Sequence, residues 1–274
     1  MKNFVNKIAD NGTQIIEVIL LVLCGLAPIL LNTAGLLAGY QVNTSPNLEN
    51  IIVYLVVRAG NAAMSIALCL LVLWRIRAHN KDFLMNRSNV YHKYVYGWYW
   101  FCAKVLGIQK CNLERVPIYM QFKLVIRGTF ADYPLDESAY PVVENESDVS
   151  ISTINLEVCD KEINLILEDT YLVDSQQIPK TKRGLRTIKI SRNDGKDKGR
   201  YFSQKYIEAV INAVRNLDQD SVVNIFATTN PMNTKHIASR TFALADRGNV
   251  QHLYVYQQNN FGNRVFEEKG YIVF

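Results

Sequence analysis

The sequence is poor in cysteine, proline and charged residues, and each shortage excludes a class of protein. Five cysteines among 274 residues are too few for a disulfide framework. Seven prolines and 14 glycines are too few for collagen or for a proline-rich disordered chain. Charged residues make up 20% of the chain, below the ~25% typical of soluble domains. With 49% hydrophobic residues, the chain is long enough for one or two compact units.

The apolar residues are concentrated in two runs near the N-terminus. Ile15–Tyr40 contains one charged residue, Glu17, and Ile51–Trp74 also contains one, Arg58. A helix of about 20 apolar residues crosses the ~30 Å hydrocarbon core of a bilayer, so both runs are long enough. The alternatives are a signal peptide, whose apolar region is shorter, and two buried core helices, which are rarely apolar on all sides. We expect a two-helix transmembrane hairpin at residues 15–75, which excludes a soluble cytosolic enzyme.

Basic residues around the two runs predict the orientation of the hairpin. Lys2 and Lys7 lie in the segment 1–14, whereas the loop 41–50 has no lysine or arginine. Four basic residues follow the second run: Arg75, Arg77, Lys81 and Arg87. Because cytoplasmic flanks carry the excess of lysine and arginine, we expect both termini in the cytoplasm. The cysteines then lie in the membrane or in a reducing compartment, so we expect free thiols.

Both runs contain polar residues that a simple anchor would not need. Arg58, Asn61 and Ser65 share one face of the second predicted helix, and Asn32 shares a face of the first with the close-packing pair Gly35–Gly39. An arginine within the membrane costs at least ~2.5 kcal/mol and usually faces a bundle interior or water. Two helices cannot enclose an interior, so we expect a homo-oligomer, for example a tetramer, whose polar residues line a pore. The alternative is that Arg58 extends towards the headgroups of the outer leaflet.

The segment that follows, residues 76–109, is rich in aromatic and basic residues, among them Trp98, Trp100 and Lys104. Aromatic rings favour the headgroup level of a bilayer, and basic side chains favour its anionic lipids. We expect a juxtamembrane collar that contacts lipid of the inner membrane through an interfacial helix within residues 88–106. An aromatic cage or a nucleic-acid stacking platform is the alternative.

Residues 110–274 have the size of one globular domain. The pattern predicts strands at 118–126, 151–158, 163–167, 185–191, 222–228, 250–257 and within 264–274, and helices at 203–217 and 230–246. Asn230 and Pro231 mark the start of the second helix, and Gly248 marks its end. Alternation of strands and helices indicates a parallel sheet. The expected fold class is therefore an α-helical membrane hairpin plus a cytoplasmic α/β domain with a mixed, partly parallel Rossmann-like sheet.

Polar side chains follow three of the predicted strands. In open α/β sheets, ligands bind beyond the carboxyl ends of the strands. Amides and hydroxyls recognise bases and riboses, while arginine and lysine suit phosphate. We expect a ligand-binding pocket made by Ser191, Arg192, Asn193, Thr228, Thr229, Asn230, Asn233, Thr234, Lys235, Gln257, Gln258, Asn259 and Arg264. The alternative is that these residues cap helices and turns.

Catalytic, metal and cofactor signatures are missing from the sequence, which has no Walker loop, G-x-G-x-x-G, H-E-x-x-H or G-x-S-x-G motif. We therefore expect no catalytic residue, no metal and no cofactor. Asp160, Glu162, Glu168 and Asp169 are interpreted as a solvated face rather than a paired-carboxylate site. The cationic run 180–205, which follows the acidic stretch 132–174, leaves nucleic acid and anionic lipid open as partners.

The layout resembles the two-transmembrane effectors of bacterial nucleotide-signalled anti-phage defence. It is similar in particular to membrane relatives of the CRISPR-associated Rossmann-fold sensors. The resemblance rests on the spans Ile15–Tyr40 and Ile51–Trp74, on the turn Thr228-Thr229-Asn230-Pro231, and on Gln257-Gln258-Asn259. It implies a multi-pass protein of the bacterial inner membrane, a cyclic or linear oligonucleotide as ligand, and binding across a symmetric subunit interface.

The mechanism that this resemblance implies is signal-dependent damage to the membrane. Nucleotide occupancy of the cytoplasmic domain changes the arrangement of the subunits, and the residues around Arg58 and Asn61 then form a conducting or leaky assembly, with abortive infection as the outcome. The sequence leaves the direction open, since ligand could open the assembly or hold it shut. The alternatives are a membrane-tethered hydrolase or nuclease that uses the acidic region 132–174, and a scaffold that recruits a partner to the membrane.

Overall fold

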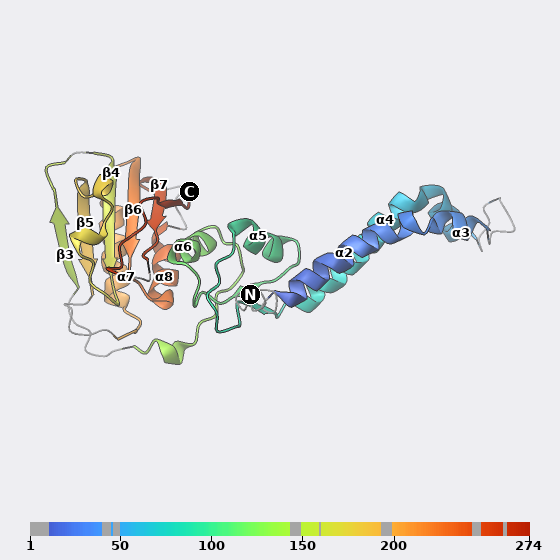
Figure 1. Ribbon diagram of the computed structural model, residues 1–274, viewed down its shortest axis with the longest axis horizontal. Coiled ribbons are helices and arrows are strands. Elements are labelled where there is room, and N and C mark those ends of the chain that lie inside the picture. The colour runs from blue at the N-terminus through green and yellow to red at the C-terminus, as the bar shows by residue number, and fades with distance from the viewer. Residues whose placement is uncertain are drawn as a thin grey trace. The chain divides into compact units, whose positions relative to one another are not determined.

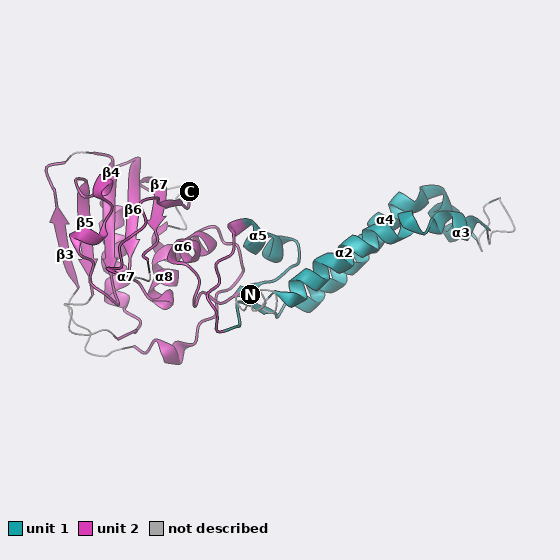
Figure 2. Cartoon of the chain, viewed as in Figure 1, with its two compact units in different colours: residues 1–88, 97–110 teal, residues 89–96, 111–274 magenta. Residues whose placement is uncertain are grey.

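A computed structural model describes residues 11–39, 45, 50–142, 149–158, 160–192, 199–242, 248–259 and 262–274. The chain divides into two compact units, which Figure 2 colours separately. The first unit comprises residues 1–88 and 97–110, and the second comprises residues 89–96 and 111–274. The chain therefore passes between the units three times, at residues 88–89, 96–97 and 110–111.

Two long helices, α2 (Gly12–Leu30) and α4 (Ile51–Asn80), pack side by side in the first unit (Figure 1). Both are long and apolar enough to cross a membrane. Large apolar side chains such as Leu30 and Leu70 are exposed on them, which is unfavourable in water and favourable in lipid. A Cβ added to Gly25 would lie 3.3 Å from Cys69 Sγ, so the small residue allows the two helices to approach closely. The predicted transmembrane hairpin is confirmed.

The helical structure of each apolar run is interrupted at one place. α2 ends at Leu30, and a separate short helix, α3 (Thr33–Gly39), follows it. Between them Asn32 has φ 46°, a left-handed conformation that asparagine adopts more readily than most residues. Within α4, Gly60 has φ 79° and ψ 177°, a conformation nearly restricted to glycine. The shared face predicted for Arg58 and Asn61 assumed a continuous helix, and Gly60 interrupts the helix between them.

The segment after α4 is fastened to the end of that helix by hydrogen bonds. It contains β1 (Leu84–Met85), α5 (Tyr96–Lys104) and β2 (Lys110–Cys111). Nη1 of Arg77 donates to the carbonyl oxygen of Lys104 at 2.7 Å. The buried Nδ2 of Asn80 donates to Glu17 Oε2 at 2.9 Å and to the carbonyl oxygen of Leu106 at 3.0 Å. Asn80 thereby joins α2, α4 and the segment after α5.

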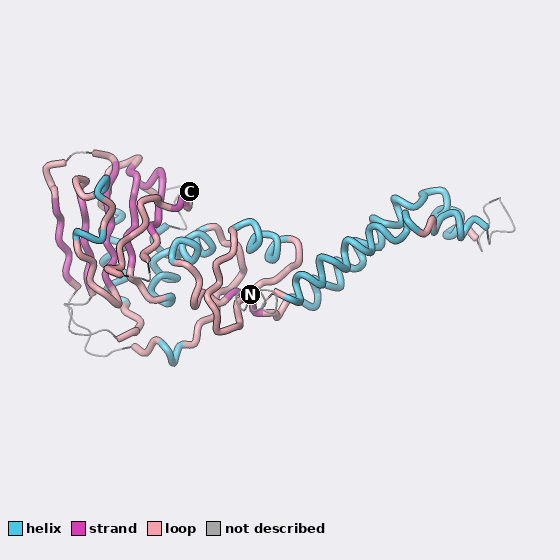
Figure 3. Tube along the Cα trace, in the orientation of Figure 1, coloured by secondary structure: helices cyan, strands magenta, loops and turns pink. Residues whose placement is uncertain are grey.

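A six-stranded sheet in the order β3-β5-β4-β6-β7-β8 forms the centre of the second unit (Figure 3). Its strands are β3 (Ser150–Ile154), β4 (Glu162–Glu168), β5 (Arg186–Ser191), β6 (Ser221–Ala227), β7 (Val250–Tyr256) and β8 (Tyr271–Ile272). The four central strands run parallel, and β3 and β8 pair antiparallel at the two edges. The predicted mixed, partly parallel sheet is confirmed.

Helices connect the parallel strands, as the alternating pattern predicted. α7 (Gln204–Arg215) lies between β5 and β6, and its N-terminus is capped by Ser203, whose Oγ accepts from the Tyr206 N–H at 3.1 Å. α8 (Pro231–Ile237) follows β6 and continues as a π-helical turn, η4 (Ala238–Phe242). The predicted end of this helix, at 246, lies outside the described residues. The described residues of this unit also form three 3-10 turns: η1 (Glu137–Ala139), η2 (Ser175–Gln177) and η3 (Lys180–Lys182).

The strand predicted at residues 118–126 is wrong, because this segment forms a helix, α6 (Ile118–Ile126). Six of its nine residues are buried, and the run is short and mostly apolar. A short buried run of this kind cannot be assigned from periodicity alone. Pro117 precedes the first turn with φ −52°, a conformation compatible with a helix start. α6 contacts β7 and α8, so it contributes to the helical layer of the domain.

Alternate residues of the central strands bury the two faces of the sheet. On one face Ile166, Phe226 and Tyr256 form a core cluster with residues of the connecting segments, such as Val173 and Phe266. The rings of Phe226 and Tyr256 stack with centroids 4.5 Å apart. The intervening residues Leu165, Ile225 and Val255 point to the other face and are also buried. The sheet is thus a rigid support for the residues at its carboxyl edge.

Candidate functional site

The carboxyl ends of β4, β5 and β6 meet at one edge of the sheet. The register pairs Glu168 with Ser191 and Leu167 with Ala227. The next residue of each strand is therefore Asp169, Arg192 or Thr228, and these three follow neighbouring strands. The structure brings together the first two polar strand ends that the sequence predicted.

A buried ion pair lies at the centre of this edge. Arg192 Nε donates to Asp169 Oδ1 at 2.6 Å, and both side chains have 0% exposure. Arg192 Nη2 also donates to the carbonyl oxygens of Asp169 at 3.1 Å and Gly199 at 2.8 Å. The guanidinium lies over the ring of Tyr201, 3.6 Å from its centroid, which adds a cation–π contact. Several groups thus compensate the desolvation of the charges.

The start of α8 completes the surroundings of the Asp169 carboxylate. Oδ2 accepts from the Asn230 N–H and from Asn233 Nδ2, each at 2.9 Å. Asn230 is also the N-cap of α8, because its Oδ1 accepts from the Asn233 N–H at 2.9 Å. Desolvation by burial raises the pKa of Asp169, and the charge of Arg192 and the hydrogen bonds from both asparagines oppose that rise. We call Asp169, Arg192, Tyr201, Asn230 and Asn233 the strand-end network.

The threonines of this edge also bond to neighbours within the protein. The hydroxyls of Thr229 and Thr234 are 2.6 Å apart and hydrogen-bonded, and Thr228 Oγ1 donates to the carbonyl oxygen of Tyr171 at 2.7 Å. Ser191 is buried at the end of β5. Lys235 is half-buried and donates to the carbonyl oxygen of Tyr133 at 2.7 Å. The side chains predicted to face a ligand at this edge therefore bond largely to other groups of the protein.

The third predicted strand end, after β7, has different partners. Gln257 Oε1 accepts from the Ile118 N–H at 3.1 Å, which fixes the start of α6. Gln258 forms a bridge with Phe266, and the Asn259 N–H donates to the carbonyl oxygen of Val265 at 3.0 Å. Arg264 is exposed and lies over the ring of Tyr171, 4.1 Å from its centroid. Asn193 lies outside the described residues.

The acidic and basic blocks of the sequence pair with each other in the fold. Lys182 bonds to Glu162, Lys189 Nζ lies 2.7 Å from Glu168 Oε1, and Arg192 pairs with Asp169. The interpretation of these carboxylates as a solvated face is wrong for Glu168 and Asp169, which are fully buried. Strands β4 and β5 are adjacent and parallel, so residues some 20 positions apart in sequence become neighbours. Three cations of the run 180–205 are thereby engaged within the domain.

Two members of the strand-end network, Asp169 and Tyr201, were missing from the sequence-based site. The available signal was the position of Asp169, two residues after the predicted strand 163–167. Tyr201 follows residues 193–198, which lie outside the described part of the chain, and no local pattern marks it. The described residues contain no group of three or more His, Cys, Asp or Glu side chains placed to hold a metal ion.

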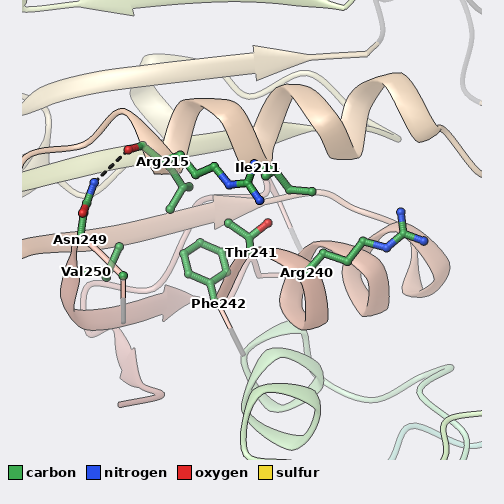
Figure 4. Close-up of a pocket in the computed structure, with 9 residues that line it drawn as sticks. Ile211, Arg215, Arg240, Thr241, Phe242, Asn249 and Val250 are labelled. Carbon is green, nitrogen blue, oxygen red and sulfur yellow. Dashed lines mark hydrogen bonds between the residues drawn. The ribbon is translucent and has the colours of Figure 1, made fainter. Parts of the chain in front are cut away.

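A cavity of about 160 Å³ lies at the other end of β7, between α7 and η4 (Figure 4). Arg215, Arg240 and Phe242 line it, together with Val250 at the amino end of the strand. Asn249 closes one side, where its Nδ2 donates to the carbonyl oxygen of Arg215 at 2.9 Å. No residue of the predicted site lines this cavity, so it is separate from the strand-end network.

Comparison with protein families identifies the chain. The model of the SMODS- and Ubiquitin system-associated 2TM effector domain, SUa-2TM, matches residues 1–274. The chain belongs to this family. The resemblance to the two-transmembrane effectors of anti-phage defence is confirmed, and the hairpin makes the SUa-2TM effector a membrane protein.

Solved structures give a second comparison. One similar structure is the SAVED/CARF-domain containing receptor Cap4 of Acinetobacter baumannii with the cyclic trinucleotide 2'3'3'-cAAA. It shares 7% sequence identity with the SUa-2TM effector, with a TM-score of 0.38. The match covers 61% of the effector and 39% of that receptor, so the chain spans well under half of the receptor's length. No curated relative matches the chain.

Proposed function

We propose that the SUa-2TM effector is an oligomeric, non-enzymatic membrane effector that senses a cyclic or linear oligonucleotide. In this proposal residues 15–75 span the bacterial inner membrane, both termini are cytoplasmic, and the second unit is the receptor. A change in the nucleotide occupancy of the receptor changes the permeability of the membrane, and the infected cell dies. The observation that carries the proposal is that this chain of the SUa-2TM family joins a membrane hairpin to an α/β domain with a mixed, partly parallel sheet.

The hairpin supports the oligomer through the residues around its two breaks. Asn61 Oδ1 accepts from the Ala34 N–H at 2.8 Å, and Asn61 Nδ2 donates to Asn32 Oδ1 at 2.9 Å, so these polar groups satisfy one another. Arg58, two residues before Gly60, is exposed on the single hairpin. A guanidinium exposed to lipid costs at least ~2.5 kcal/mol. Association of several hairpins around Arg58 removes it from lipid and places a charged residue at their shared interior.

In this proposal the strand-end network has a structural role in the receptor and does not contact the ligand. Arg192, Asn230 and Asn233 are each at most 2% exposed and bond to Asp169 and Tyr201. A ligand that replaced these bonds would leave a buried carboxylate without its partners, at a cost of several kcal/mol. We therefore assign these residues to the positioning of α8 against β4 and β5.

Reconstitution of the full chain into dye-loaded liposomes tests the proposal. The vesicles are challenged with a panel of cyclic di- and trinucleotides and linear oligoadenylates, and dye release is measured with and without each compound. We expect at least one compound to change the release rate, in either direction, in proportion to its occupancy. Release that no compound alters, from vesicles with inserted protein, contradicts the proposal. Conversion of the nucleotide into products instead supports the alternative of a membrane-tethered hydrolase.

A further inference from the structure

An open groove of about 810 Å³ lies in the second unit. Four segments that are distant in sequence form it: residues 93–96, α6, β7 and the segment 269–272 around β8. We call it the tyrosine–lysine groove and define it by Lys93, Lys123, Lys269, Tyr119, Tyr254 and Tyr271. Its volume lies in the range of small-molecule sites, about 300–1,000 Å³.

The aromatic side chains of the groove are held in place by the fold. The rings of Tyr119 and Tyr271 stack with centroids 3.7 Å apart and planes 8° apart. The hydroxyl of Tyr271 donates to Glu267 Oε2 at 2.8 Å, and β8 pairs antiparallel with β7, matching Tyr254 with Ile272. Burial, followed by this hydrogen bond, raises the pKa of Tyr271 to about 12, so the ring is neutral at physiological pH. Such rings present faces on which a nucleobase can stack.

The charged residues that line the groove are all lysines. Among the described residues, no ion pair engages Lys93, Lys123 or Lys269. Lys123 Nζ donates to the carbonyl oxygen of Ile272 at 3.0 Å and lies 5.2 Å from the centroid of the Tyr96 ring. Desolvation, and then the nearby Arg127, lower the pKa of Lys123. An anion in the groove would offset both effects, because it supplies the opposite charge that this lysine lacks.

We propose that the tyrosine–lysine groove is the nucleotide-binding site of the receptor, with bases stacked on its tyrosines and phosphates bound by its lysines. This inference rests on the proposed function and places the ligand away from the strand-end network. The aromatic rings and the lysines that line the groove match a ligand that is aromatic and anionic at once. The headgroup of an anionic lipid shares the charge but has no aromatic base to stack on the tyrosine rings.

The position of the groove in the chain connects binding to the membrane. Residues 93–96 line the groove, and the chain continues from Tyr96 directly into Gly97, which belongs to the first unit. A ligand that orders this segment therefore acts on a covalent link between receptor and hairpin. No other described segment that lines the groove is followed immediately by a residue of the first unit.

The test measures nucleotide binding by the full chain in lipid nanodiscs, using the same panel of cyclic and linear oligonucleotides. The double variant Lys93→Glu/Lys269→Glu reverses two exposed charges of the groove, and we expect it to weaken binding at least tenfold. The matched control Lys180→Glu/Lys205→Glu reverses two exposed charges outside the groove, and we expect a change below threefold. Tyr271→Leu removes one stacking ring, and we expect at least a fivefold loss, against no loss for Tyr171→Leu.

Photo-crosslinking of the unmodified chain with an azido-nucleotide gives a readout that does not depend on variants folding. We expect labelled peptides that contain residues 93–96 or 269–272. Labelling confined to residues 228–235, or equal affinity of the groove variants and their controls, overturns the groove and leaves the proposed function standing. A parent protein that binds no compound of the panel overturns both. Groove-dependent binding to phosphatidylserine vesicles without nucleotide binding overturns the nucleotide assignment in favour of lipid.

Discussion

Arg192 Nε lies 2.6 Å from Asp169 Oδ1, and neither side chain is exposed to solvent. The two residues follow adjacent parallel strands, so their contact fixes the relative position of β4, β5 and the start of α8. Asn230 and Asn233 complete the coordination of the carboxylate. Arg192, Asn230 and Asn233, which the sequence predicted as ligand-binding residues, thus belong to an internal network of the second unit.

Substitution of Arg192 is expected to affect stability strongly. Arg192→Ala leaves the Asp169 carboxylate buried without its cation, which costs about 3–5 kcal/mol of the free energy of unfolding. Arg215→Ala removes an exposed guanidinium and is expected to change that free energy by less than about 0.5 kcal/mol. Denaturant unfolding of the full chain, followed by a spectroscopic signal of the second unit, measures the free energy of unfolding of both variants. Equal stability of the two variants would show that the buried pair does not stabilise the fold.

The ion pair between Glu162 and Lys182 predicts that the stability of the fold depends on pH. Burial acts to raise the pKa of Glu162, but hydrogen bonds from Lys182 and Asn224 and the charge of Lys182 outweigh it, and the pKa lies below its usual 4.5. A carboxyl group with a lowered pKa in the folded state stabilises the protein above pH 4.5, and this contribution is lost as the pH falls through the lowered value. The side chain is 35% exposed, so the contribution is below about 1 kcal/mol.

Glu162→Gln is therefore expected to lower the free energy of unfolding at neutral pH, and its difference from the parent is expected to shrink in acid. Urea unfolding at a series of pH values below neutrality measures this difference. Glu268→Gln, which changes an exposed carboxylate, is the matched control. A Glu162→Gln effect that stays constant down to the acid limit of the folded protein contradicts the assignment.

The sequence predicted most strands because a strand buried in a parallel sheet is a short apolar run with turn residues at its ends. It failed at residues 118–126, where a short buried helix produces the same pattern. It predicted that Arg192 and Asn230 lie at one edge, since both follow strands, but not that they face inward towards Asp169. That contact depends on the register Glu168–Ser191, which no local signal specifies.

The tyrosine–lysine groove is a second feature that the local sequence could not predict. Lys93, Lys123 and Lys269 lie in three segments that are far apart in the sequence, and the fold brings them to one cavity. The aromatic residues around Lys93 were predicted as part of a membrane collar because local composition indicates an interface. Which of these residues border a cavity depends on the packing of α6 and β8, which is a non-local property.

Asn61 is expected to stabilise the break in the first membrane helix. Its side chain bonds to the Ala34 N–H and to Asn32 Oδ1. Hydrogen bonds between membrane helices contribute about 0.6 kcal/mol on average and up to about 1.7 kcal/mol. A double-mutant cycle of Asn32→Leu and Asn61→Leu, followed by SDS unfolding, is expected to give a coupling energy in this range. Ala62→Leu, at an exposed neighbouring position, is the control, and its coupling to Asn32→Leu is expected to be near zero.

Arg58 is expected to act in the assembled protein rather than in the single hairpin. Its side chain is exposed on the protomer, so Arg58→Leu removes an unfavourable charge and leaves insertion into the membrane intact. If oligomers shelter Arg58 in a conducting interior, this variant loses dye release from liposomes, and Arg58→Lys, which keeps the charge, retains part of it. Unchanged dye release by inserted Arg58→Leu removes this residue from the mechanism.

The effect of Gly60→Ala on the stability of the hairpin is expected to have opposite signs for an interrupted and for a continuous α4. In an uninterrupted helix, glycine is destabilising by about 0.5–1 kcal/mol relative to alanine, so Gly→Ala stabilises. Gly60 has φ 79° and ψ 177°, where a side chain costs of order 1–3 kcal/mol, so we expect Gly60→Ala to destabilise the hairpin. Gly39→Ala is the matched control, because a Cβ there has open space and the residue lies at the end of α3. SDS unfolding of both variants measures the difference, and stabilisation by Gly60→Ala would mean that α4 is continuous and that Arg58 and Asn61 share one face.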